Sequence, residues 1–131
     1  MGRVVEAPIR ELPGGTQTTL EVVKEPVLAP VTASQSDLKR FLKEVSLKYD
    51  VDYIQLEQTI QGESSFNPKA IGDDGRSLGI SQYTLPTWKD FCGGIDERLD
   101  PYKSMDCMAK MFSLGKQSRW TVWRNLYGRR N

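Results

Sequence analysis

The 131-residue sequence contains no histidine and only two cysteines, Cys92 and Cys107. Without His, and without a Cys-x-x-Cys pair, it offers no ordinary zinc site and neither a Ser-His-Asp nor a Cys-His catalytic arrangement. We therefore expect no metal and no cofactor. The two Cys are compatible with a disulfide, which would close a loop of about 15 residues, and also with two buried free thiols.

Long hydrophobic runs are absent as well. No apolar stretch approaches the roughly 18 residues of a membrane span, so we predict no transmembrane segment. The N-terminus "MGRVVEAPIRELPGG" lacks the basic start, apolar stretch and cleavage site of a secretory signal, which leaves any export route open. A hydrophobic content of 38% with 27% charged residues is typical of a soluble globular protein, and the length suits one domain.

Acidic residues are missing from the C-terminal end of the chain. After Asp106 the charged residues are all basic: Lys110, Lys116, Arg119, Arg124, Arg129 and Arg130. Such an end is usually a solvated face, although it also suits attraction to a polyanion. A small helical nucleic-acid-binding protein is therefore an alternative. A protein that reads nucleic acid would more often show a wider basic field and a recognisable module, so we predict no specific nucleic-acid partner.

The chain divides into a tail and a helical body. Residues 1–35 hold four of the seven Pro and no sustained apolar period, which predicts a flexible leader or linker. Its short alternating piece "TLEVV" could instead form an edge strand or dock as an arm. Residues 36–131 are expected to form the domain.

Two amphipathic helices are predicted at the start of the domain. The segment "SQSD", residues 34–37, supplies N-cap side chains for the helix "DLKRFLKEVSLKYD". Its apolar residues recur at helical spacing: Leu38, Phe41, Leu42, Val45 and Tyr49. Asp50 or Asp52 can cap a second helix, "YIQLEQTIQGE", which carries Glu63 near its C-terminal end, on or beside the buried face.

Glu63 is the candidate catalytic acid. The negative end of the helix dipole and partial burial both raise the pKa of a carboxyl group there. An acid kept protonated near neutral pH can donate a proton to a glycosidic oxygen. Alternatively, Glu63 reaches solvent or pairs with Lys69 or Arg76. The loop after it is rich in Gly, Asp and Ser, as binding sites for sugars tend to be.

The segment "ESSFNPKAIGDDGRSLGISQYTLPTW" resembles the lytic transglycosylase and goose-type lysozyme superfamily. That family combines a catalytic Glu followed by Ser, an "xFNP.A" loop, a Gly-rich turn, a Gly-x-x-Gln segment and a "P.TW" helix start. The resemblance covers about residues 36–127. It implies a mainly α, lysozyme-like domain with a substrate groove and at most a minimal β-hairpin around residues 70–84. It also implies an extracytoplasmic monomer that binds peptidoglycan glycan strands.

The resemblance assigns Glu63 as the general acid and Ser64 as the residue that helps position it. It gives substrate-binding roles to five residues: Ser64, Ser81, Gln82, Tyr83 and Tyr127. Ser81 stands where the family commonly has Met, and only Tyr127-Gly128 echoes the family's Ala-Tyr-Asn-Gly segment. Trp120 and Trp123 are expected to be core and groove-wall residues.

The number of carboxylates separates two mechanisms. If Glu63 acts alone, the resemblance implies a lytic transglycosylase that leaves 1,6-anhydro-N-acetylmuramic acid ends. If Asp73 or Asp74 holds a water, the groove would instead act as a hydrolytic muramidase. Aspartates in a "GDDG" turn are more often turn formers than bases. A glycan-binding domain without catalysis is a third alternative.

Overall fold

The computed structural model describes residues 34–128. The predicted leader, including "TLEVV", lies outside the described residues except for its last two positions. The boundary predicted between leader and domain therefore stays a prediction.

Two capped helices open the described part. Helix α1, Gln35–Tyr49, begins after Ser34, whose hydroxyl accepts a hydrogen bond from the Asp37 N–H at 3.1 Å. Helix α2, Tyr53–Ser64, begins after Asp52, whose carboxylate accepts from the Ile54 and Gln55 N–H groups. Asp50 instead ends α1 in the left-handed conformation. Asp52 is thus the cap of the second helix.

A small sheet follows α2. Strands β2 (Ile71–Gly72), β3 (Ser77–Leu78) and β4 (Tyr83–Thr84) pair antiparallel in that order, and the 3₁₀ turn η1 (Asp73–Gly75) joins β2 to β3. The prediction of a mainly helical, lysozyme-like domain is confirmed. The sheet has one strand more than the predicted hairpin, although each strand is only two residues long.

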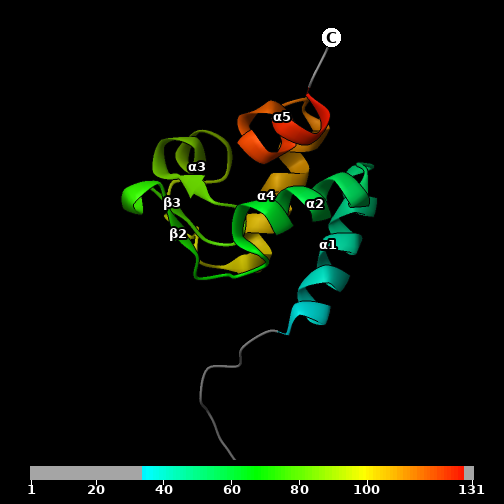
Figure 1. The fold of residues 1–131 in the computed structure, drawn as a ribbon, viewed down its shortest axis with the longest axis horizontal. Helices are drawn as coiled ribbons and strands as arrows, with labels where there is room; N and C mark the ends of the chain where they lie inside the picture. Colours follow the sequence, from blue (N-terminus) through cyan, green and yellow to red (C-terminus); the bar gives the residue numbers. More distant parts are fainter. Residues whose placement is uncertain (1–33, 129–131) are drawn as a thin grey trace, which may run out of the picture. The chain divides into compact units, whose positions relative to one another are not determined.

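Helix α4, Pro101–Ser113, is the core of the described domain. Asp100 caps it and Pro101 opens its first turn. Its buried side chains occur all along its length: Ser104, Met105, Cys107, Met108, Ala109, Met111 and Phe112. Figure 1 shows α4 between α1 and α2 on one side and the sheet with α3 (Leu85–Phe91) on the other. The 3₁₀ turn η2 (Gln117–Arg119) and helix α5 (Thr121–Tyr127) end the described part.

Cys92 and Cys107 form a disulfide in the structure. Cys92 caps the C-terminus of α3 and Cys107 lies in the middle of α4, so the bond fastens α3 to the central helix. Among the helices of residues 34–128, none is both long enough and apolar enough to cross a membrane.

Candidate active site

Glu63 lies in the last turn of α2 and lines a cleft of about 210 Å³. The side chain is half-buried. The cleft is walled by residues from η1, β3, β4 and α3 on one side and from η2 and the start of α5 on the other. A carboxyl group from the end of one helix therefore faces a hollow built by segments from across the domain.

Burial raises the pKa of Glu63 above its ordinary value, and the nearby negative charge of Asp73 raises it further. Two groups lower the pKa, each by less than burial raises it. The Val122 N–H donates a long hydrogen bond of 3.4 Å to Glu63 Oε2, and Arg124 supplies a positive charge. Within residues 34–128, Glu63 forms no ion pair with Lys69, Arg76 or any other cation. The carboxyl group is thus disposed to hold a proton.

Ser64 fastens the end of α2 to the loop beneath the cleft. Its hydroxyl donates a hydrogen bond to the Ile80 carbonyl at 2.6 Å. The next two residues, Ser65 and Phe66, have left-handed backbone, and the Phe66 ring is buried. The helix therefore ends abruptly at Ser64, one residue after Glu63, and the Ser64 hydroxyl ties this end to the loop.

The structure distinguishes the two aspartates of the "GDDG" turn. Asp73 lines the cleft, and its Oδ2 accepts a 2.5 Å hydrogen bond from the buried hydroxyl of Ser77. Both residues are exposed, but Asp74 does not line the cleft. Both have left-handed backbone, which Asp tolerates better than most residues. Asp73 is therefore both a turn former and the second carboxylate of the cleft.

Gln82 lines the cleft, but both of its amide hydrogens are used internally. Nε2 donates to the carbonyls of Ala70 and Gly79 at 3.1 and 2.9 Å. Its Oε1 lies so close to Gly72 that a Cβ there would come within 2.3 Å. The side chain therefore clamps the sheet region together. Contact with a sugar through Gln82 stays a prediction.

The three other predicted binding residues differ in where they lie. Ser81 is 0% exposed and belongs to the core rather than to the cleft lining. Tyr83 lines the cleft but is 2% exposed, and its hydroxyl donates to Met111 Sδ inside the core. Tyr127 donates to Gln58 on α2, away from the cleft lining. The Ser81 side chain does not reach the cleft lining, and substrate contacts of these three residues stay predictions.

The cleft also contains residues that the sequence did not single out as binding residues. They are mostly hydroxyl-bearing: Ser77, Thr84, Thr87, Arg119, Trp120 and Thr121. Trp120 was expected to be a core and groove-wall residue, and it is buried and also lines the cleft. Its Nε1 donates to the Ser81 carbonyl at 2.8 Å, and its ring packs on Tyr83. The threonines lacked any local signal, because isolated Thr residues are common on surfaces. In the described part of the chain, no three acidic or sulfur ligands gather as a metal site would require.

A family model described as the transglycosylase SLT domain matches residues 40–124. The chain belongs to this family. No curated protein and no solved structure matches the chain. The matched residues begin inside α1, end inside α5 and include every residue that lines the cleft. Membership of this family supports a general function of the lytic-transglycosylase type, which acts on peptidoglycan.

Proposed function

We propose that the chain is a lytic transglycosylase that cleaves the β-1,4 bond between N-acetylmuramic acid and N-acetylglucosamine, with Glu63 as its only catalytic acid and base. The observation that carries this proposal is the environment of Glu63. The carboxyl group is half-buried in a cleft, its pKa is raised, and it has no ion-pair partner within residues 34–128. A protonated acid of this kind is what glycosidic cleavage requires.

The same group then acts as the base. Glu63 gives its proton to the glycosidic oxygen as the C1–O bond breaks, and the acetamido oxygen of the substrate stabilises the positive charge at C1. The resulting carboxylate takes the proton from the C6 hydroxyl, whose oxygen closes on C1 to form the 1,6-anhydro sugar. The Val122 N–H and Arg124 favour the ionised form of Glu63 and so stabilise the carboxylate that the first step leaves behind.

A muramidase is the second candidate because Asp73 lines the same cleft. Its carboxylate is fixed by Ser77 at 2.5 Å, as a residue that must hold a water would need to be. In that mechanism Asp73 activates a water on the opposite face of the sugar while Glu63 protonates the leaving oxygen. Asp74 has no corresponding position. A glycan-binding domain without catalysis is the third candidate.

The proposed setting is extracytoplasmic, where peptidoglycan lies. The disulfide between Cys92 and Cys107 supports this, because such bonds persist mainly in oxidising compartments. We further propose that residues 1–35 serve as a linker and that the domain works as a monomer.

Digestion of purified peptidoglycan, followed by mass spectrometry of the product ends, tests the proposal. We expect 1,6-anhydro ends from the wild type and none from Glu63→Gln, whose amide keeps the shape but cannot donate the proton. Glu57→Gln is the matched control, since Glu57 lies on the same helix and pairs with Lys39 at 3.6 Å, outside the cleft lining. It should cleave as the wild type does.

Other products would select another candidate. If the products carry reducing ends, and these ends disappear in Asp73→Asn but persist in Asp74→Asn, the muramidase replaces the transglycosylase as the proposed function. Retained glycan binding without any cleavage would leave a binding domain. Salt-sensitive binding to DNA without binding to the cell wall would favour the nucleic-acid alternative.

A further inference from the structure

Arg98 is the only charged side chain that is buried among the described residues. Only 7% of the residue is exposed, although it lies in the irregular segment between α3 and α4. It does not line the cleft that holds Glu63. Charged side chains are almost never buried unless they are paired, so its contacts need an explanation.

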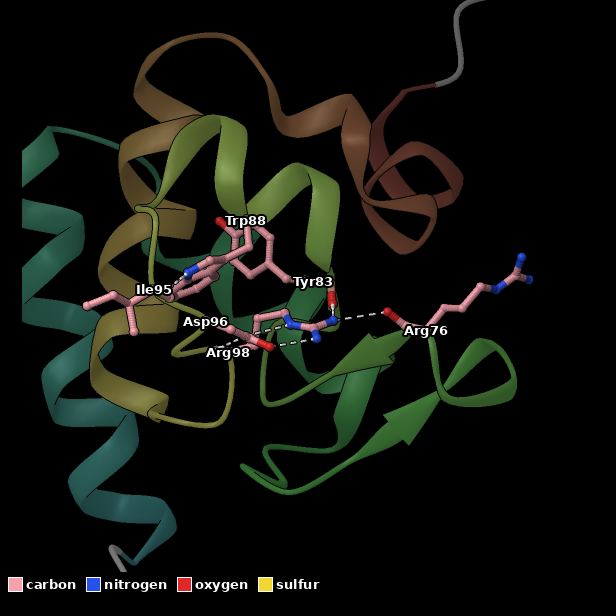
Figure 2. Close-up of polar contacts among 6 residues, drawn as sticks. All are labelled: Arg76, Tyr83, Trp88, Ile95, Asp96 and Arg98. Carbon is pink, nitrogen blue, oxygen red and sulfur yellow. Dashed lines mark hydrogen bonds and ion pairs between the residues drawn. The ribbon is translucent and has the colours of Figure 1, made fainter.

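The guanidinium makes hydrogen bonds in two directions, as Figure 2 shows. Nε and Nη2 donate to the two carboxylate oxygens of Asp96 at 2.8 and 2.9 Å, in the bidentate geometry that Arg favours. Nη1 donates to the carbonyls of Arg76 and Tyr83 at 3.2 and 3.1 Å. One nitrogen thus joins two segments of the small sheet, while Asp96 balances the charge.

Each of these two carbonyls belongs to a residue that directly precedes a cleft-lining residue in the sequence. Arg76 is followed by Ser77, whose hydroxyl holds the Asp73 carboxylate. Tyr83 is followed by Thr84, which shares a hydrogen bond of 3.2 Å with Thr87 on the α3 wall. Ser77 and Thr84 are themselves paired across β3 and β4. The guanidinium therefore fixes the strand ends from which this wall of the cleft is built.

The Arg98 segment is itself held rigidly. The Trp88 indole N–H donates to the Ile95 carbonyl at 2.8 Å (Figure 2). The Arg98 carbonyl lies against Gly79, where a Cβ would come within 2.0 Å of it. The backbone of Arg98 thus contacts the turn at Gly79, while its side chain holds the carbonyls of Arg76 and Tyr83.

We propose that Arg98, with Asp96 as its counter-ion, is a positioning residue that holds Asp73 and Thr84 in place opposite Glu63. The inference rests on the proposed function, since it concerns the same cleft. Residues that orient the groups around a reacting centre affect turnover strongly, because displacements of about 1 Å can cost about 100-fold in rate.

The pKa of Glu63 provides a readout that a purely structural role would not move. The charged groups facing Glu63 are Asp73 from η1 and Arg124 from α5, and Arg119 from η2 lines the same cleft. Asp73 raises the pKa of Glu63, so displacement of Asp73 lowers it. Activity that needs protonated Glu63 would then fail at lower pH. The guanidinium lowers the pKa of Asp96 to about 2, so Asp96 stays ionised throughout such a titration.

The test uses two variants. Arg98→Lys keeps the positive charge but lacks the planar guanidinium that bonds in two directions. Asp96→Asn removes the counter-charge at a side chain that is 41% exposed. We expect kcat on soluble glycan strands to fall by about 10- to 100-fold while KM changes less than about threefold. The alkaline limb of the pH–rate profile should move to lower pH, in the same direction as in Asp73→Asn.

Lys103→Met is the matched control. It removes the neighbouring ion pair with Glu97, of 2.5 Å, which also joins the segment before α4 to that helix but does not reach the strands. This variant should keep the wild-type kcat and alkaline limb. Thermal unfolding of every variant separates a loss of folded protein from a loss of turnover.

The titration of Glu63, followed by NMR of its side-chain carboxyl carbon, gives the same answer without any activity. A lowered pKa in Arg98→Lys, Asp96→Asn and Asp73→Asn, with no change in Lys103→Met, supports the inference even if the wild type cleaves nothing and the proposed function fails. A wild-type pKa in folded Arg98→Lys and Asp96→Asn overturns it. The inference is also overturned if the loss of turnover in Arg98→Lys and Asp96→Asn equals the loss of folded protein measured by thermal unfolding.

Discussion

At the scale of single residues, Glu63 is governed by opposing local fields. Burial disfavours its charge, and a position at the C-terminal end of a helix acts in the same direction, while the N–H of Val122 at the start of α5 favours the charge. The net effect is a raised pKa. This balance suits a group that must first hold a proton and then accept one.

Ser81 gives a residue-scale prediction about stability. Its hydroxyl is fully buried and has no hydrogen-bond partner in the described part of the chain. An unpaired buried hydroxyl costs free energy, so Ser81→Ala should leave the free energy of unfolding unchanged or raise it by up to ~1 kcal/mol. KM for glycan strands should not change, because the side chain does not reach the cleft. Denaturant unfolding and steady-state kinetics check both.

A rise in KM for this variant with unchanged stability would contradict the core position of Ser81. It would restore the substrate contact that the resemblance implied. Ser36→Ala, at an exposed position of α1, is the matched control.

At the scale of elements, the cleft depends on how closely α5 approaches α2. Gly62 makes the approach possible, since a Cβ there would lie 2.6 Å from Val122 Cγ1. Real Cβ atoms do not come that close, and a Val side chain is stiff. The same contact brings the Val122 N–H within 3.4 Å of Glu63. A glycine one residue before Glu63 therefore decides where the second wall of the cleft lies.

Gly62→Ala should consequently weaken both stability and turnover. The better helix propensity of Ala contributes about 1 kcal/mol, but overpacking costs about 1–3 kcal/mol. We expect a net loss of up to about 2 kcal/mol in the free energy of unfolding and a fall in kcat. Adding Val122→Ala makes room for the new methyl group, so the double variant should recover much of both.

The double-mutant cycle from thermal unfolding and kinetics is the measurement. If the two substitutions are additive, with no recovery in the pair, the close contact between α2 and α5 does not set the geometry of the cleft.

At the scale of the whole molecule, the disulfide holds the α3 side to the central helix. It closes a loop of 15 residues, for which the loss of the bond costs roughly 3 kcal/mol. Reduction should therefore lower the melting temperature by roughly 10–20 °C in a domain of this size. Thermal unfolding with and without reductant measures the effect.

The control is the Cys92→Ala/Cys107→Ala variant, whose melting temperature should be low and insensitive to reductant. Equal melting temperatures for oxidised and reduced wild type would show that the bond adds no stability.

The basic C-terminal segment also has internal contacts at this scale. Arg119 stacks on the Phe91 ring and lines the cleft, and Arg124 donates to the Ser118 carbonyl and the Thr121 hydroxyl. Two of the six basic residues thus make internal contacts around the cleft, which the charge pattern alone did not indicate.

The sequence by itself determined the features that depend on neighbours in the chain. Ser34 and Asp52 cap helices through bonds to N–H groups two or three residues away, and Glu63 comes at the end of its helix by helical spacing. These interactions are local, so residue type and position suffice to predict them. The family motif likewise lies in one continuous segment.

Only the tertiary structure decided which side chains face the cleft. Asp73 and Asp74 are adjacent in the sequence, but only Asp73 is brought to Glu63, through Ser77 and the strand ends that Arg98 holds. Ser81 and Tyr127 matched the motif but point elsewhere, because the contacts of Trp120 and Gln58 fix their surroundings. Such placements depend on packing between segments 16 to 69 residues apart, for which short-range periodicity carries no information.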